Sequence, residues 1–134
     1  LMAELSSALT ATACNLAKER TVFMLRPIPE MGFNVPRASS VRIALGLPPE
    51  VSIPKSSYWA RNSWVWKAQD AARDQCGVVI LDGTQEFCDD ARCYGTKNGR
   101  PIYFDDDHLS EYGNKLLIPT FKQIPSHLPA LRRP

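Results

Sequence analysis

The sequence predicts an α/β domain with a small parallel sheet flanked by helices and with a cysteine-stapled hairpin. Two observations support this class. Short runs of strand-forming apolar residues, at 21–25 and 77–82, each follow a segment whose apolar residues recur at helical spacing. Helix alternating with buried strand is typical of parallel α/β layers. In addition, Cys88 and Cys93 stand close together shortly before an Asn-Gly turn signal.

The first half of the chain predicts helix, strand, loop and helix in that order. Apolar spacing predicts a helix over 2–18, and the run at 21–25 predicts a strand buried on both faces. Prolines in segment 26–32 would remove ladder donors, so this segment is expected to be a loop at the carboxyl end of the strand. Ligands bind at that edge in open α/β sheets, although a stiff connector is the alternative. Asn34, Pro36 and Gly46 predict the start and end of the next helix.

The second half predicts a longer helix over 56–75, with Gly77 just after its end, and then the strand 77–82. Segment 84–104 is expected to be an excursion that contains a hairpin turning at Asn98-Gly99. A last helix over 109–121 carries Pro119 as a kink or break, and residues 123–134 are predicted to form an irregular tail.

Composition is that of an ordinary soluble protein, with 134 residues, 44% hydrophobic and 22% charged. The net charge of +2 predicts neither a nucleic-acid partner nor a strongly anionic substrate. No apolar run approaches the roughly 20 residues that cross a bilayer, so this segment is not expected to insert into a membrane. Because the chain starts at Leu1, directly in a helical pattern, we expect it to be a piece of a longer polypeptide.

The four cysteines predict one disulfide. The spacing of Cys88 and Cys93 suits a bridge across a tight hairpin, with inert thiols or a metal site as alternatives. A zinc site would need a second close pair, which the sequence lacks. Cys14 and Cys76 lie on apolar helix faces and are predicted to be buried thiols. A disulfide would place the domain in an oxidising compartment.

Asp105 stands three residues before His108, between a short apolar stretch and the last helix. At this spacing a carboxylate can orient an imidazole so that the ring takes a proton from a nucleophile. Two other interpretations remain open from residue types alone. Asp107 or Ser110 would cap the following helix in an acidic surface turn, or the Asp and His side chains would bind a metal.

These residues resemble the last sequence block of the SGNH/GDSL esterase superfamily. The similarity is to the SGNH domains appended to membrane-bound acyltransferases of the acyltransferase-three family, and it covers most of residues 16–118. The segments that carry it are Tyr103-Phe104-Asp105-Asp106-Asp107-His108-Leu109-Ser110, then Gly113, and upstream Pro27-Ile28-Pro29-Glu30-Met31-Gly32-Phe33, Val35-Pro36, Cys88, Cys93 and Tyr94. The resemblance implies a partial flavodoxin-like (SGNH hydrolase) fold, with residues 1–134 forming the C-terminal portion of one such domain.

The resemblance also implies a function. His108 would be the general base of a Ser-His-Asp triad and Asp105 the residue that orients it, without cofactor or metal. The whole protein would transfer an acyl group, such as acetyl, to a cell-surface polysaccharide such as O-antigen. Its partners would be an acyl donor, a glycan acceptor and a membrane acyltransferase domain of the same polypeptide, at the periplasmic face of the bacterial inner membrane. Arg26 and Glu30 are predicted substrate contacts.

One departure from the family pattern is important: the chain contains no Gly-Asp-Ser, the motif that supplies the superfamily's nucleophile. The chain is therefore expected to be inactive alone, because it carries the base without the nucleophile. The alternatives are a non-catalytic module that binds a glycan or a partner, and a fragment of a stand-alone SGNH esterase.

Overall fold

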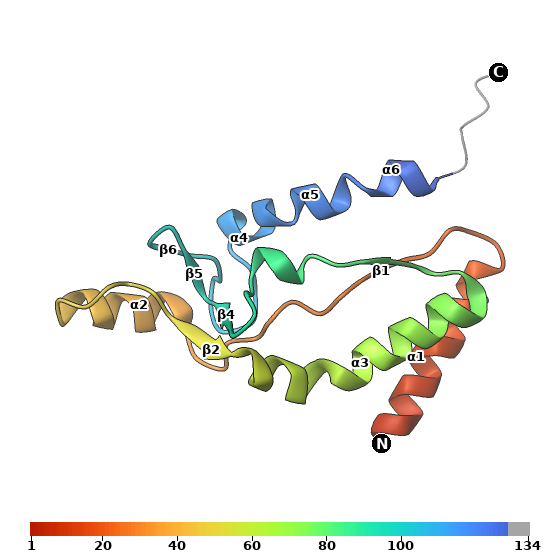
Figure 1. Ribbon diagram of the computed structural model, residues 1–134, viewed down its shortest axis with the longest axis horizontal. Helices are drawn as coiled ribbons and strands as arrows, with labels where there is room; N and C mark the ends of the chain where they lie inside the picture. The colour runs from red at the N-terminus through yellow and green to blue at the C-terminus, as the bar shows by residue number, and fades with distance from the viewer. Residues whose placement is uncertain (129–134) are drawn as a thin grey trace. The chain divides into compact units, whose positions relative to one another are not determined.

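The computed structural model describes residues 1–128, and Figure 1 labels most of their elements. The chain divides into two compact units. Unit 1 comprises residues 1–27, 62–83 and 119 onward, and unit 2 comprises residues 28–61 and 84–118. Helix α3 (Lys55–Cys76) begins in unit 2 and continues into unit 1.

Unit 1 contains the predicted parallel pair of strands. Strand β1 (Phe23–Leu25) pairs with β3 (Val79–Leu81), with Phe23 opposite Val79 and Leu25 opposite Leu81. The fully buried residues beside them are small, Ala13, Ala72 and Val78, and Met24 and Ile80 of the strands pack against these. The expectation that β1 is buried on both faces is wrong, because all three of its residues are only half-buried. Among the described residues this sheet has two strands, so each strand keeps an edge without a neighbour.

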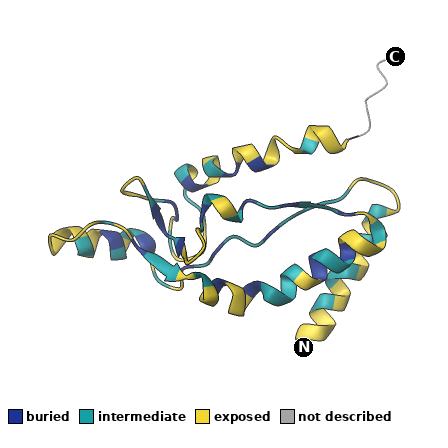
Figure 2. Cartoon of the chain, in the orientation of Figure 1, coloured by how far each residue is buried: buried dark blue, intermediate teal, exposed yellow. Residues whose placement is uncertain are grey.

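Helix α1 (Met2–Ala17) lies beside α3 in unit 1, as Figure 1 shows. The Thr10 hydroxyl donates to the Ala68 carbonyl at 3.1 Å, and a disulfide joins Cys14 to Cys76. The prediction of two buried thiols is therefore wrong: each cysteine is half-buried and bonded to the other. The Ala13 side chain is buried, whereas most of the helix is exposed in Figure 2.

Unit 2 is built from short antiparallel pairs. Helix α2 (Val35–Ala44) starts as predicted, with the Asn34 side chain accepting from the Arg37 backbone N–H at 2.9 Å. Strand β2 (Ser52–Pro54) pairs with β4 (Arg92–Tyr94), and the 3₁₀ turn η1 (Thr84–Glu86) precedes the confirmed disulfide between Cys88 and Cys93.

The Asn-Gly hairpin is also confirmed. Strands β5 (Thr96–Lys97) and β6 (Arg100–Pro101) pair antiparallel around Asn98 and Gly99, whose φ angles are 53° and 71°. Two consecutive left-handed residues define the turn that matches the twist of a tight hairpin. The buried side chains of unit 2 include Val35, Phe87, Ile102 and Tyr103.

The predicted last helix is broken into pieces. Helix α4 (Glu111–Leu116) is followed by α5 (Ile118–Phe121), with the break one residue before the pair Ile118-Pro119. The expectation of an irregular tail is wrong for α6 (Ile124–His127), a single turn whose Pro125 occupies a first-turn position that needs no N–H donor. The rest of the tail, 129–134, lies outside the described residues.

The two disulfides should differ in their contribution to stability. Cys14 and Cys76 are 62 residues apart, whereas Cys88 and Cys93 are 5 apart. On the chain-entropy model the long loop is worth about 4 kcal/mol and the short one about 2 kcal/mol. We expect C14A/C76A to lower the free energy of unfolding by about twice as much as C88A/C93A, measured by urea denaturation of the oxidised proteins. Equal losses, or a larger loss for C88A/C93A, would contradict the loop-length account.

Candidate active site

Residues 104–108 form a tight surface loop, here called the Asp-His loop. At its base the Phe104 N–H donates to the His108 carbonyl at 2.7 Å. The Ser110 N–H donates to the Ile102 carbonyl at 3.0 Å, and Tyr103 bridges to Leu109. Ile102 and Tyr103 are buried in unit 2, so the loop rises from a fixed base.

A second segment of unit 2 holds the Asp-His loop from the side. The Met31 N–H donates to the Asp106 carbonyl at 2.8 Å, and the Val35 N–H donates to the Asp105 carbonyl at 3.0 Å. Nearby, the buried Tyr103 hydroxyl donates to the Pro29 carbonyl at 2.6 Å. The proline-rich loop predicted from the sequence therefore anchors the Asp-His loop through its backbone.

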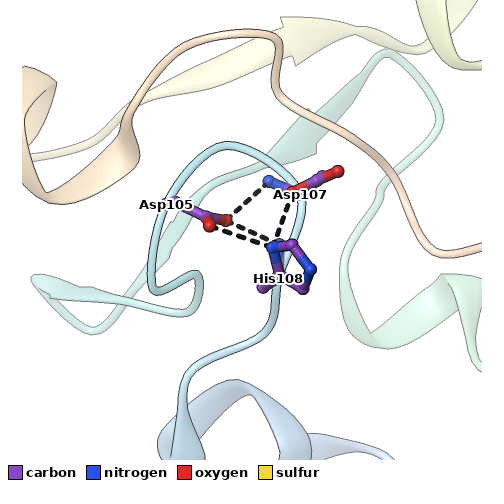
Figure 3. A group of neighbouring side chains, drawn as sticks. All are labelled: Asp105, Asp107 and His108. Carbon is purple, nitrogen blue, oxygen red and sulfur yellow. Dashed lines mark hydrogen bonds and ion pairs between the residues drawn. The ribbon is translucent and has the colours of Figure 1, made fainter.

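Asp105 organises the Asp-His loop through both of its carboxylate oxygens. Oδ1 accepts from the backbone N–H of Asp107 at 3.1 Å and of His108 at 2.8 Å. Oδ2 lies 2.9 Å from Nδ1 of His108. Figure 3 shows these contacts together with that of Asp107, whose Oδ1 is also 2.9 Å from Nδ1. The imidazole thus faces two carboxylates through the same nitrogen, and Nε2 lies on the other side of the ring.

The charges of the Asp-His loop stabilise each other. Hydrogen bonds from the backbone N–H groups of His108 and Asp107 lower the pKa of the Asp105 carboxyl to about 2. The hydrogen bond and the charge of Asp105, followed by the charge of Asp107, raise the pKa of His108 above its usual value. Asp105 is therefore an anion at neutral pH, and it favours the protonated imidazole.

Of the two residues that the sequence offers as a cap for the following helix, Ser110 is the one that caps it. The Ser110 side chain accepts from the Gly113 N–H at 3.1 Å and caps α4, so Asp107 is left to face His108. Gly113 is needed at this point because a Cβ there would lie 2.0 Å from the Ile102 carbonyl oxygen. The cap and the close approach of α4 fix where the Asp-His loop ends.

The arrangement has the parts of a general base. The carboxylate of Asp105 holds the ring through Nδ1, and the ring, which is 75% exposed, can present Nε2 to a hydroxyl group. Asp105, Asp107 and His108 are also, among the described residues, a group whose ligand atoms lie within 4.8 Å of one another. Such exposed acidic groups are common without an ion, so the cluster by itself does not indicate a metal centre.

Arg26, a predicted substrate contact, is buried and makes its contacts within unit 1. Its side chain is 6% exposed and stacks over the Trp66 ring at 3.9 Å. Its guanidinium donates to the Gln69 side chain at 3.1 Å and to the Asp70 carboxylate at 2.5 Å. These bonds account for its burial, and its contact with substrate stays a prediction.

Glu30, the other predicted contact, lies in unit 2, where it forms an ion pair with Arg61. Its carboxylate is 34% exposed, so a ligand can still reach it, and its role also stays a prediction. The contribution of Asp107 was missed, because the sequence shows three adjacent acids without indicating which of them turn toward the ring.

The chain belongs to the family described as the SGNH domain fused to AT3 domains, whose model matches residues 2–123. It is thus an SGNH-type module of the acyltransferase kind, and the resemblance found in the sequence is confirmed. No curated protein and no solved structure matches it. Of the helices within residues 1–128, none combines the length and the apolar character that crossing a membrane requires.

The three acids of the Asp-His loop should affect His108 unequally. We expect D105N to lower the pKa of His108 most, D107N less and D106N least, following the order of their interactions with the ring. The imidazole resonance of each variant, followed by NMR from pH 4 to 9, measures this order. A pKa that is unchanged in D105N would contradict the pairing.

The raised pKa of His108 and the lowered pKa of Asp105 determine how the stability of the fold depends on pH. The protonated His108 stabilises the folded state below the usual histidine pKa, and this contribution is lost as the pH rises through the raised value. The Asp105 carboxylate contributes above the usual aspartate pKa, and its contribution is lost as the pH falls toward about 2.

Proposed function

We propose that the chain is the C-terminal part of the SGNH domain of an O-acyltransferase that modifies a cell-surface polysaccharide such as O-antigen. In this proposal His108 and Asp105 supply the base pair of a Ser-His-Asp triad. The contact between Asp105 Oδ2 and Nδ1 of His108 carries the proposal, because it leaves Nε2 for the nucleophile. The family, with its fused AT3 domains, supports the acyltransferase setting.

The proposed chemistry has two halves. In the first, Nε2 of His108 takes the proton of a serine hydroxyl as the serine oxygen attacks the carbonyl carbon of the acyl donor. The protonated imidazole then gives that proton to the departing group, and an acyl-serine ester remains. In the second half, Nε2 takes the proton of a sugar hydroxyl as its oxygen attacks the ester, and the imidazolium returns a proton to the serine.

Asp105 has a positioning role in both halves. Its charge stabilises the imidazolium each time it forms, and its contact with Nδ1 keeps the proton there in the neutral ring. Because Oδ1 is held by two backbone N–H groups, Oδ2 has a fixed position for the ring. None of the serines of this chain follows Gly-Asp, so the nucleophile is assigned to another part of the complete domain.

The two disulfides support an extracytoplasmic site of action. Both cysteine pairs are bonded, and disulfides persist in oxidising compartments such as the bacterial periplasm. The polysaccharide acceptor would be met on that side of the membrane.

The purified chain should have no esterase activity of its own. It holds a base but no serine in a Gly-Asp-Ser context, and the catalytic oxygen would be missing. We expect hydrolysis of p-nitrophenyl acetate at the background rate, equal in the unmodified chain and in H108A. Hydrolysis well above background that is lost in H108A would overturn this expectation.

In the full gene product, H108A should lower O-acyl transfer by about 10²–10⁴-fold, the usual contribution of a general base. D105N should also lower transfer strongly. H127A, at the other histidine of the chain, and D106N, beside the pair, are the matched controls and should retain it. The readout is the O-acyl content of the surface polysaccharide, at matched protein levels. Full transfer by H108A would favour a non-catalytic module instead.

A further inference from the structure

We propose that unit 2 carries a binding groove for an acidic saccharide, one that bears a carboxylate on a sugar ring. The groove holds about 460 Å³ and is lined by Phe33, Arg42, Glu50, Val51, Ser52 and Arg92. Its assignment to the acceptor glycan rests on the proposed function, whereas its binding of the saccharide can be tested alone.

The two arginines approach the groove from different elements. Arg42 comes from α2, and its Nε donates to the Pro48 carbonyl at 2.7 Å. Arg92 comes from β4, where its Nε donates to the Ser52 hydroxyl at 2.7 Å and Nη2 to the Ser52 carbonyl at 3.2 Å. These bonds fix each guanidinium group through its Nε atom, and that of Arg92 also through Nη2. Among the described residues neither Nη of Arg42 is bonded, nor is Nη1 of Arg92.

Guanidinium groups held in this way suit a carboxylate. Arginine presents a planar set of donors that matches the two oxygens of a carboxylate, and prior fixing of the side chain reduces the entropy lost on binding. Glu50 is the one acid that lines the groove, so its fixed charges sum to +1. Arg42 and Arg92 are 50 residues apart and come together only when α2 and β4 meet in the folded chain.

The other lining groups favour a sugar over a bare anion. The Glu50 carboxylate can accept from sugar hydroxyls, and the Ser52 hydroxyl, which accepts from Arg92, still has its own proton to donate. The half-buried Phe33 ring and Val51 provide an apolar wall for the C–H face of a sugar ring. The groove thus offers arginines for the carboxylate of a uronic acid, Glu50 for its hydroxyl groups and Phe33 for the C–H face of its ring.

The groove is connected to the Asp-His loop through one short segment. Phe33 lies midway between Met31 and Val35, whose N–H groups bond to the carbonyls of Asp106 and Asp105. A saccharide seated against Phe33 therefore rests on the segment that anchors the proposed base. This connection is the reason to assign the groove to the acceptor.

Binding can be measured on the chain as it is. We expect trigalacturonic acid to bind and to shift the NMR signals of Phe33, Arg42 and Arg92, and the neutral maltotriose not to bind at the same concentration. R42Q and R92Q should each weaken the affinity about tenfold or more, the usual effect of losing a charged hydrogen bond. R42K keeps the charge but not the planar donors, and should also weaken binding.

R20Q is the matched control, because it removes the same charge from an exposed arginine of unit 1. It should bind like the unmodified chain. Circular dichroism of each variant confirms the fold. No binding of trigalacturonic acid, full affinity in both R42Q and R92Q, equal binding of maltotriose, or equally tight binding of inorganic phosphate would overturn the proposal.

The groove and the base are tested separately. H108A should retain full affinity for trigalacturonic acid, since His108 does not line the groove. Loss of O-acyl transfer in H108A would support the proposed function, and loss of binding in R42Q would support the groove. Each result stands whatever the other shows.

Discussion

The site depends on the hydrogen bonds of the Asp105 carboxylate. One oxygen accepts two backbone N–H groups and so fixes the Asp-His loop, while the other holds the imidazole of His108. The same residue therefore determines both the shape of the loop and the orientation of the ring. Its backbone carbonyl binds the Val35 N–H, which ties the loop to the start of α2. A substitution at Asp105 would remove the two backbone N–H bonds and the contact with the ring at once, whereas a substitution at Asp106 removes only a neighbouring charge.

In unit 1 a disulfide adds stability to a core made of small side chains. Strands β1 and β3 are three residues long, and the fully buried part of the core beside them is two alanines and a valine, with half-buried residues such as Met24 and Ile80 packed against it. Burial of such small side chains yields little hydrophobic free energy. Each unit carries one disulfide, between α1 and α3 in unit 1 and beside β4 in unit 2. These bonds restrict the unfolded chain instead.

The sequence was informative where structure is encoded locally. Asn34 with Pro36 specifies a helix start, Asn98-Gly99 specifies a hairpin, and the spacing of Asp105 and His108 brings carboxylate and ring together. Contacts between distant residues were not encoded in this way. Cys14 and Cys76 are 62 residues apart, so spacing could not show that the fold brings the two thiols within bonding distance. The internal bonds of Arg26 and the groove residues also depend on elements that meet only in the folded chain.

The exposure of His108 bears on how the proposed base would work. In this chain the ring is open to water, and its acidic neighbours raise its pKa, which reduces the fraction that can accept a proton at neutral pH. Covering the ring would have the opposite effect, because desolvation disfavours the charged imidazole. Under the proposed function, a nucleophile segment and a bound acceptor would both exclude water from Nε2. Burial would then lower the pKa of His108 while Asp105 kept the orientation of the ring, so the carboxylate pair is suited to a ring that becomes buried only when the complete site is assembled.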